Sequence, residues 1–143
     1  MENNMKKLSG KEYSEKMRGV KLNSVYLTEC SAKVNRKKIP ESLEIKIGDR
    51  TGFKSKNKKV YQIFHDYKLK AKGLKEKENF LDVDVRFCVE IASENMLEKD
   101  FFEIFSRTSL PMITYPYFRE FVGNISGRMN VPPLTLPLIK RKG

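Results

Sequence analysis

The sequence contains few of the residues on which catalytic and metal sites depend, with no tryptophan, one histidine and two cysteines. Acid–base and nucleophilic catalysis need several poised groups, and His65 is the only imidazole. Because His65 alternates with Tyr61 and Tyr67, we expect a packed, hydrogen-bonded histidine rather than a catalyst. Cys30 and Cys88 lie too far apart for a CxxC pair or zinc knuckle, so we expect buried, reduced thiols. We therefore predict no enzyme activity, no metal and no cofactor.

The sequence also shows no secretion signal and no membrane span. The start Met-Glu-Asn-Asn contains no apolar signal core, and no apolar run reaches the roughly 18 residues that would cross a bilayer. A disulfide between the two cysteines would need an oxidising compartment, which this start does not indicate. We expect a cytoplasmic protein without membrane insertion.

Phosphate-binding and metal-binding motifs are missing as well. Residues 48–52 contain two glycines but no lysine-serine or lysine-threonine end, so we expect a turn there. Asp82, Asp84 and Glu90 share one face of an expected strand, where they could hold a divalent cation or act as paired catalytic carboxylates. Alternating carboxylates are more often the solvated side of a strand, which is the interpretation that we favour.

Basic side chains outnumber acidic ones by 29 to 18, which leaves a net charge of +11. Such a surplus attracts nucleic acid, anionic membrane or acidic protein segments, and it also keeps a lysine-rich protein soluble. Lysines cluster at residues 54–59, 68–77 and 140–142, close to several aromatic rings. Nucleic-acid binding is therefore the alternative function, although no RNA-recognition or zinc-finger signature accompanies the charge.

Alternation of apolar and polar residues predicts four strands, at residues 22–34, 43–47, 61–71 and 81–91. The last has the clearest pattern. In the first, we expect one face to carry Leu22, Ser24, Tyr26, Thr28, Cys30, Ala32 and Val34. The third and fourth strands should form an antiparallel hairpin, because the connection at residues 73–79 is too short for a parallel crossover.

Beyond Glu94 the apolar period changes to about 3.6, which indicates helices. Residues 96–105 predict a short helix. A longer one should begin near Pro116, since proline is tolerated in a first helical turn, and continue to Met129. Later prolines predict an extended segment at residues 131–139.

Strands followed by helices indicate an α+β protein, in which a four-stranded antiparallel sheet carries the C-terminal helices on one face. We expect residues 1–19 to be a flexible or short-helical segment, in which Ser9 could cap a helix, and residues 20–143 to form a single domain. A sheet of this size leaves apolar surface uncovered, so we also expect an oligomer.

Four short motifs in the last third carry a family resemblance. They are Tyr-Pro-Tyr-Phe-Arg-Glu-Phe at 115–121, Gly-Arg-Met-Asn at 127–130, Pro-Pro-Leu at 132–134 and Leu-Pro-Leu-Ile at 136–139. In this order and spacing they resemble the helix and following segment of SecB-type and SecB-like chaperones. The residues that match the motif or shape its backbone are Pro116, Arg119, Glu120, Arg128, Pro132, Pro133 and Pro137.

The resemblance implies a homodimer or homotetramer that holds unfolded or non-native polypeptides in apolar grooves without ATP. By similarity, the client-binding residues would be Phe101, Phe105, Tyr115, Phe118, Leu134 and Leu136. An apolar helix stripe is more often core than binding site, and we expect Phe121, Val122 and Ile125 to be core or oligomer interface. A purely structural oligomer or adaptor for one folded partner is a third alternative.

Two departures from the family bear on the partner. Members that deliver preproteins to the SecA motor are acidic and carry a further C-terminal helix and tail, whereas this chain is basic and the sequence ends at Gly143. Of the roles that the resemblance implies, protein export through SecA is therefore less favoured. A chaperone dedicated to one client, such as a toxin–antitoxin partner, fits better.

Overall fold

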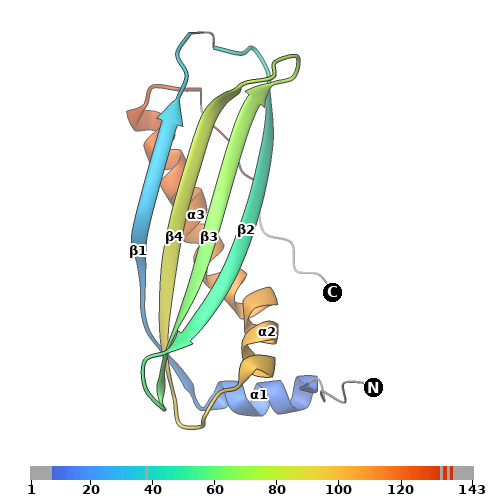
Figure 1. The fold of residues 1–143 in the computed structure, drawn as a ribbon, viewed down its shortest axis with the longest axis vertical. Coiled ribbons are helices and arrows are strands. Elements are labelled where there is room, and N and C mark those ends of the chain that lie inside the picture. Colours follow the sequence, from blue (N-terminus) through green and yellow to red (C-terminus); the bar gives the residue numbers. More distant parts are fainter. Residues whose placement is uncertain (1–7, 38, 133, 135, 137–143) are drawn as a thin grey trace.

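The structure is a computed structural model that describes residues 8–37, 39–132, 134 and 136. The element order is α1 (Gly10–Arg18), β1 (Val20–Val34), β2 (Leu43–Ser55), β3 (Val60–Gly73), β4 (Asn79–Ser93), α2 (Lys99–Arg107) and α3 (Ser109–Arg128). The strands form one antiparallel sheet in the order β1-β4-β3-β2. Both α2 and α3 lie behind the same face of this sheet (Figure 1), which confirms the predicted fold class.

The helix-covered face of the sheet holds the core. Odd-numbered residues of β3 and β4 point to it and are almost all buried, as strict two-residue alternation requires. Phe118 of α3 is fully buried there and stacks on Tyr67 of β3 with ring centroids 4.5 Å apart. A second aromatic cluster, built around Phe101, Phe102 and Phe105 of α2, covers the other end of the sheet. Fully burying a side chain of this size contributes roughly 1.5–3 kcal/mol.

The first helix joins this second cluster. The Ser9 hydroxyl accepts a hydrogen bond from the Glu12 N–H at 3.2 Å and so caps the start of α1. Tyr13 stacks on Phe101 at 5.2 Å, and its hydroxyl lies 2.8 Å from the Ser109 hydroxyl. These contacts attach α1 to the helix layer.

The predicted face of β1 is wrong in its middle. The register of β1 against β4 shifts between Leu22 and Ser24 and again between Leu27 and Glu29. Each β-bulge inserts one residue and reverses which side chains face the helices. Val25 and Leu27 therefore take the helix-side positions, opposite Val89 and Phe87, and Tyr26 lies on the outer face beside Cys88. Two bulges restore the original parity, so Cys30, Ala32 and Val34 keep the predicted side.

The second strand is longer than predicted, and the expected turn at residues 48–52 is wrong. β2 continues to Ser55 in unbroken register with β3. Gly48 and Gly52 lie on the outer face in mid-strand, where pairing with β3 outweighs the low strand preference of glycine.

The start of the long helix also differs from the prediction. α3 begins at Ser109, so Pro111 lies in its first turn and Pro116 lies inside it. Pro116 has no N–H for the carbonyl of Met112, but both residues are on the exposed side of the helix, where water can hydrogen-bond that carbonyl. Packing of the opposite side against the sheet holds the helix together across the proline.

Candidate functional site

A cleft of about 660 Å³ opens between β2 and α2 on the helix side of the sheet. From β2 it is lined by Thr51, Gly52 and Phe53. From α2 its lining combines the apolar Phe102 and Ile104 with polar and charged residues, which are Lys99, Asp100, Glu103, Ser106 and Arg107. Phe53 stacks on the buried Phe102 with centroids 4.2 Å apart and interplanar angle 15°, yet 43% of its surface remains exposed. The cleft therefore presents an aromatic wall to solvent.

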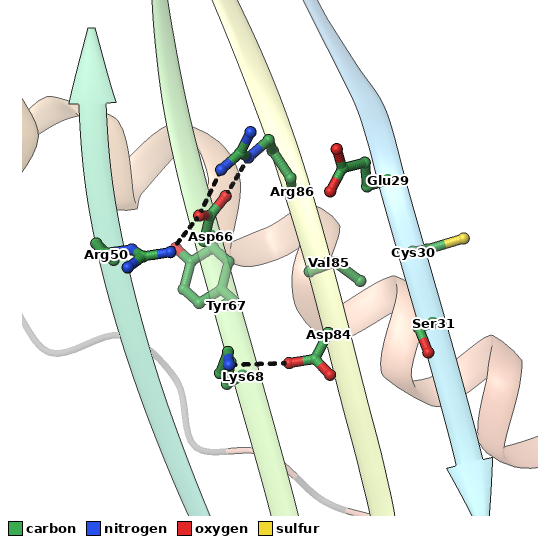
Figure 2. Close-up of a pocket in the computed structure, with 10 residues that line it drawn as sticks. All are labelled: Glu29, Cys30, Ser31, Arg50, Asp66, Tyr67, Lys68, Asp84, Val85 and Arg86. Atoms are coloured by element: carbon green, nitrogen blue, oxygen red, sulfur yellow. Dashed lines mark hydrogen bonds and ion pairs between the residues drawn. The ribbon is translucent and has the colours of Figure 1, made fainter.

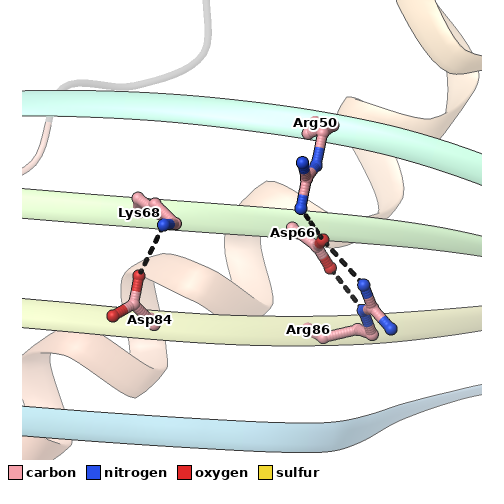
Figure 3. Close-up of polar contacts among 5 residues, drawn as sticks. All are labelled: Arg50, Asp66, Lys68, Asp84 and Arg86. Atoms are coloured by element: carbon pink, nitrogen blue, oxygen red, sulfur yellow. Dashed lines mark hydrogen bonds and ion pairs between the residues drawn. The ribbon is translucent and has the colours of Figure 1, made fainter.

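The outer face of the sheet carries charges in rows that cross the strands. Asp66 of β3 accepts two hydrogen bonds from Arg86 of β4, at 2.6 and 3.0 Å, and lies 3.7 Å from Arg50 of β2 (Figures 2 and 3). The Arg86 hydrogen bonds hold the pKa of Asp66 below its usual value and raise the pKa of Arg86. One row along the strands, Lys68 lies 4.0 Å from Asp84 (Figure 3).

These side chains border a shallow pocket of about 340 Å³ on the outer face (Figure 2). Of its acidic side chains, Asp66 is paired with Arg86 and Asp84 lies near Lys68. The pocket is open to solvent along the outer face of the strands. Cys30 borders it and is exposed, contrary to the buried position expected for this thiol, whereas Cys88 is buried; both are free. The pocket offers a polar surface and no set of groups poised for a reaction.

The three carboxylates singled out in β4 each have a polar neighbour. Asp82 accepts a hydrogen bond from Asn79 at 3.0 Å, Asp84 lies near Lys68, and Glu90 lies 3.4 Å from Lys56. Among the described residues, no group of three or more His, Cys, Asp or Glu side chains could hold a metal ion. Nor is any helix in the described part of the chain long and apolar enough to cross a membrane.

His65 is packed and hydrogen-bonded, as predicted from its aromatic neighbours. It is fully buried, with Nδ1 2.7 Å from the Thr114 hydroxyl of α3 and Nε2 2.8 Å from the carboxylate of Asp49 on β2. The Tyr67 hydroxyl also lies 2.8 Å from that of Thr114. Burial lowers the pKa of His65, against the opposing effect of Asp49, and burial likewise raises the pKa of Tyr67. The group joins α3 to β2 and β3.

Comparison with known proteins depends on structure, since no family model and no curated protein matches this sequence. A solved structure of the Mycobacterium tuberculosis SecB-like chaperone Rv1957, in complex with a ChAD peptide from the Rv1956 HigA1 antitoxin, superposes with a TM-score of 0.80. The two sequences are 18% identical, and the match covers 92% of this chain and 99% of that one. The chain has the SecB-like fold. A Streptococcus agalactiae protein of unknown function gives a TM-score of 0.42 at 9% identity, over 83% of this chain and 97% of that one.

Within the SecB-like fold, five of the six residues predicted to bind clients fall into two core clusters. Phe101 and Phe105 belong to the cluster of α2, whereas Tyr115, Phe118 and Leu136 belong to the cluster of α3. The sixth, Leu134, is partly buried against the α3 cluster. Tyr115 retains 9% exposure and the other four cluster members 5% or less. The structure thus places five of them beneath the surface and does not bring all six together.

The motif residues of α3 lie mostly on its solvent side. Glu120 and Arg128 are exposed, Arg119 is half-buried, and Arg128 donates a hydrogen bond to the Asn124 side chain at 2.7 Å. Pro132 is exposed just after the helix. The predicted positions Pro133 and Pro137 fall outside the described residues.

Sequence reasoning missed Phe53, the most exposed aromatic residue of the cleft. The preceding residues 48–52 were interpreted as a turn, although Ile45, Ile47 and Phe53 share one parity that would have extended the strand. Phe102 lies in the helix predicted at residues 96–105, but it could not be paired with Phe53, because contacts between distant segments leave no local pattern.

Proposed function

We propose that the protein is an ATP-independent chaperone, not an enzyme, that holds extended segments of a non-native client polypeptide. The observation that carries the proposal is the SecB-like fold along 92% of the chain together with an aromatic cleft open at its surface. Apolar client side chains would be buried there at about 25 cal/mol per Å², offset by the cost of ordering the client. The six predicted client-binding residues would then support the surface from beneath, with Leu134 nearest to solvent.

A dedicated client is favoured over general protein export. The structurally similar Rv1957 chaperone is in complex with a peptide from an antitoxin, so a chaperone of this fold can bind a segment of one particular partner protein. We place the activity in the cytoplasm, and engagement of SecA is not part of the proposal.

Self-association into a homodimer or homotetramer belongs to the same proposal. Leu22 and Leu27 of β1 are 49% and 40% exposed, and Met112 and Tyr117 of α3 are 52% and 50% exposed. The centroid of the Tyr117 ring lies 6.3 Å from that of Phe87, and Phe87 lies opposite Leu27 across the sheet, so Tyr117 and Leu27 share a neighbour. Large exposed apolar patches mark association surfaces.

Delayed aggregation of a chemically unfolded client at stoichiometric ratios tests the function. The wild type should suppress light scattering without ATP, and Phe53→Ser should weaken suppression because it removes the aromatic wall. Leu74→Ser is the matched control, since Leu74 is 65% exposed but lies in the β3–β4 turn. If the wild type failed to suppress the aggregation of several clients, the chaperone proposal would be wrong. If Phe53→Ser and Leu74→Ser lost suppression equally, the cleft would not be the client-binding surface.

A further inference from the structure

Among the described residues no segment pairs with the outer edge of β2, and this edge is unusually open for a long edge strand. Every residue from Gly48 to Ser55 is exposed, and the pairing with β3 contains no register shift. Proteins commonly protect sheet edges with proline, bulges or a covering segment. β2 contains no proline and no bulge, whereas β1 at the opposite edge is interrupted twice. The β2 edge is therefore competent to pair with another strand.

The hydrogen-bond pattern shows which backbone groups this edge offers. The Lys56 N–H donates to the Val60 carbonyl at 2.9 Å, so this pair belongs to the hydrogen-bonded class of the antiparallel ladder. Hydrogen-bonded and non-hydrogen-bonded pairs alternate along the ladder. The backbone groups of even-numbered β2 residues therefore bond to β3, whereas the N–H and C=O groups of odd-numbered residues point away from β3, toward the free edge of the sheet. Thr51 and Phe53 therefore offer free backbone groups at the edge, directly beside the cleft.

The same alternation fixes the side-chain environment of an added strand. Its residues opposite Thr51 and Phe53 would share their face and lie over the aromatic cleft. Its residues opposite Arg50, Gly52 and Lys54 would lie on the outer face. A β carbon added at Gly52 would meet no atom within 4 Å, so the outer face has room there.

The charge of β2 on the outer face determines which side chains an added strand can carry there. On the outer face of the sheet, β2 carries a basic residue at every fourth position, with a glycine midway between successive ones; these residues are Lys46, Arg50 and Lys54. Arg50 already lies 3.7 Å from Asp66, and Lys70, which lies opposite Lys46, has Asp82 as its neighbour on β4. Among the described residues, Lys46 and Lys54 form no ion pair, so these two lysines are the charges that a carboxylate on an added strand would meet. A second copy of β2 would bring the same basic row alongside, which is unfavourable. An acidic strand is complementary.

We propose that the β2 edge binds an extended client segment by strand addition, with apolar side chains toward the cleft alternating with acidic side chains toward the outer face. This rests on the proposed function and names the chemistry of its client. Backbone hydrogen bonds supply the affinity, while the cleft and the basic row supply the selectivity.

A labelled octapeptide, Leu-Asp-Val-Glu-Phe-Asp-Val-Glu, is the probe, and fluorescence anisotropy is the readout with the full-length protein. Its block isomer, Leu-Val-Phe-Val-Asp-Glu-Asp-Glu, has the same composition and charge but cannot segregate the two kinds of side chain. We expect the alternating peptide to bind at least about tenfold tighter, since several charge and apolar contacts depend on the alternation.

Thr51→Pro tests the backbone pairing. This substitution removes an N–H that points to the free edge and leaves the hydrogen bonds to β3 in place. An edge strand tolerates proline at such a position. Probe affinity should fall about tenfold or more, because a hydrogen bond is lost and the ring obstructs the edge. Thr51→Val keeps the N–H but also loses the threonine hydroxyl, so it should bind the probe clearly tighter than Thr51→Pro, and the difference between the two variants measures the effect of the backbone change. Circular dichroism confirms that both variants fold; if Thr51→Pro does not, the peptide pair and the charge variants decide alone.

The charge arm compares Lys46→Glu/Lys54→Glu with Lys21→Glu/Lys33→Glu, which makes the same net change on the outer face of β1. Only the first should weaken the probe, again by roughly tenfold. Equal weakening by both, or equal binding of the two peptides, overturns the proposal. So does self-association that Thr51→Pro abolishes without any probe binding, since the edge would then pair with its own copy.

The aggregation assay separates this inference from the proposed function. If the wild type suppresses aggregation but does not prefer the alternating peptide, strand addition is wrong and the chaperone function stands. If the edge binds the peptide selectively but no client is held, the chaperone function is wrong and the edge assignment stands.

Discussion

The two faces of the sheet are built from the same four strands but depend on different interactions. On the helix side, Val83 and Val89 are fully buried and Ile91 is 1% exposed, all from a single strand. On the outer side, Asp66 and Arg86 bridge neighbouring strands while remaining in contact with water. Dense apolar contact holds one face, and partly solvated charge covers the other.

This difference separates stability from recognition. Apolar burial contributes about 25 cal/mol per Å², whereas solvent-exposed ion pairs contribute little because water competes for both partners. The helix side therefore holds the fold, and the outer side can change its charges at small cost. A basic row such as that of Lys46, Arg50 and Lys54 can thus serve partner selection.

The largest expected effect in a comparison of the two faces is that of Phe118→Ala on the helix side. Phe118 is fully buried and stacked on Tyr67, so its truncation should cost about 3–5 kcal/mol of unfolding free energy. Urea denaturation at pH 7 measures the change. Glu120→Ala, on the exposed side of the same helix, should stay within about 0.5 kcal/mol. Similar losses in the two variants would contradict the assignment of stability to the buried face.

A smaller effect should come from pH through the buried His65. Its folded pKa lies below the unfolded value of about 6.5, so on acidification the unfolded chain takes up a proton first. Stability should accordingly be complete above about pH 7 and fall between pH 6.5 and the lower folded pKa, by at most about 1.4 kcal/mol per pH unit. Denaturation of wild type and His65→Gln from pH 7.5 to 5 measures it. The variant should lose this part of the slope, and an unchanged slope would assign it to other groups.

How much of the fold the sequence predicts depends on the regularity of each strand. β3 and β4 were predicted nearly to their ends, because neither has an irregularity within its alternating residues. The middle of β1 could not be assigned correctly, since each bulge reverses the parity and leaves no distinct residue signature. The helix was predicted to begin near Pro116, but α3 begins at Ser109, because packing on the sheet outweighs the local preference of proline for the first helical turn.

The candidate site was less predictable than the fold. The resemblance in α3 indicated the SecB-like fold correctly, but the aromatic residues chosen from it proved to be largely buried, since apolar helix positions serve the core first. The cleft joins Phe53 and Phe102, which are far apart in sequence and meet only through the sheet register. Edge status of β2 likewise follows from the strand order, which local patterns do not encode.

The smallest expected effect is that of Asp66→Asn on the outer face. Arg86 holds the pKa of Asp66 below its unfolded value of about 3.9, so the contribution of the carboxylate is present above that pH and lost as pH falls through the folded pKa. At pH 7 the variant should lose stability, but far less than Phe118→Ala, because both partners contact water. Denaturation at pH 7 and pH 2.5 should show the difference between variant and wild type shrinking in acid. Asp84→Asn, which loses only a 4.0 Å contact with Lys68, should change less at either pH. A loss in Asp66→Asn comparable to that of Phe118→Ala would mean that the outer face also holds the fold, and that its charges are not free to select a partner.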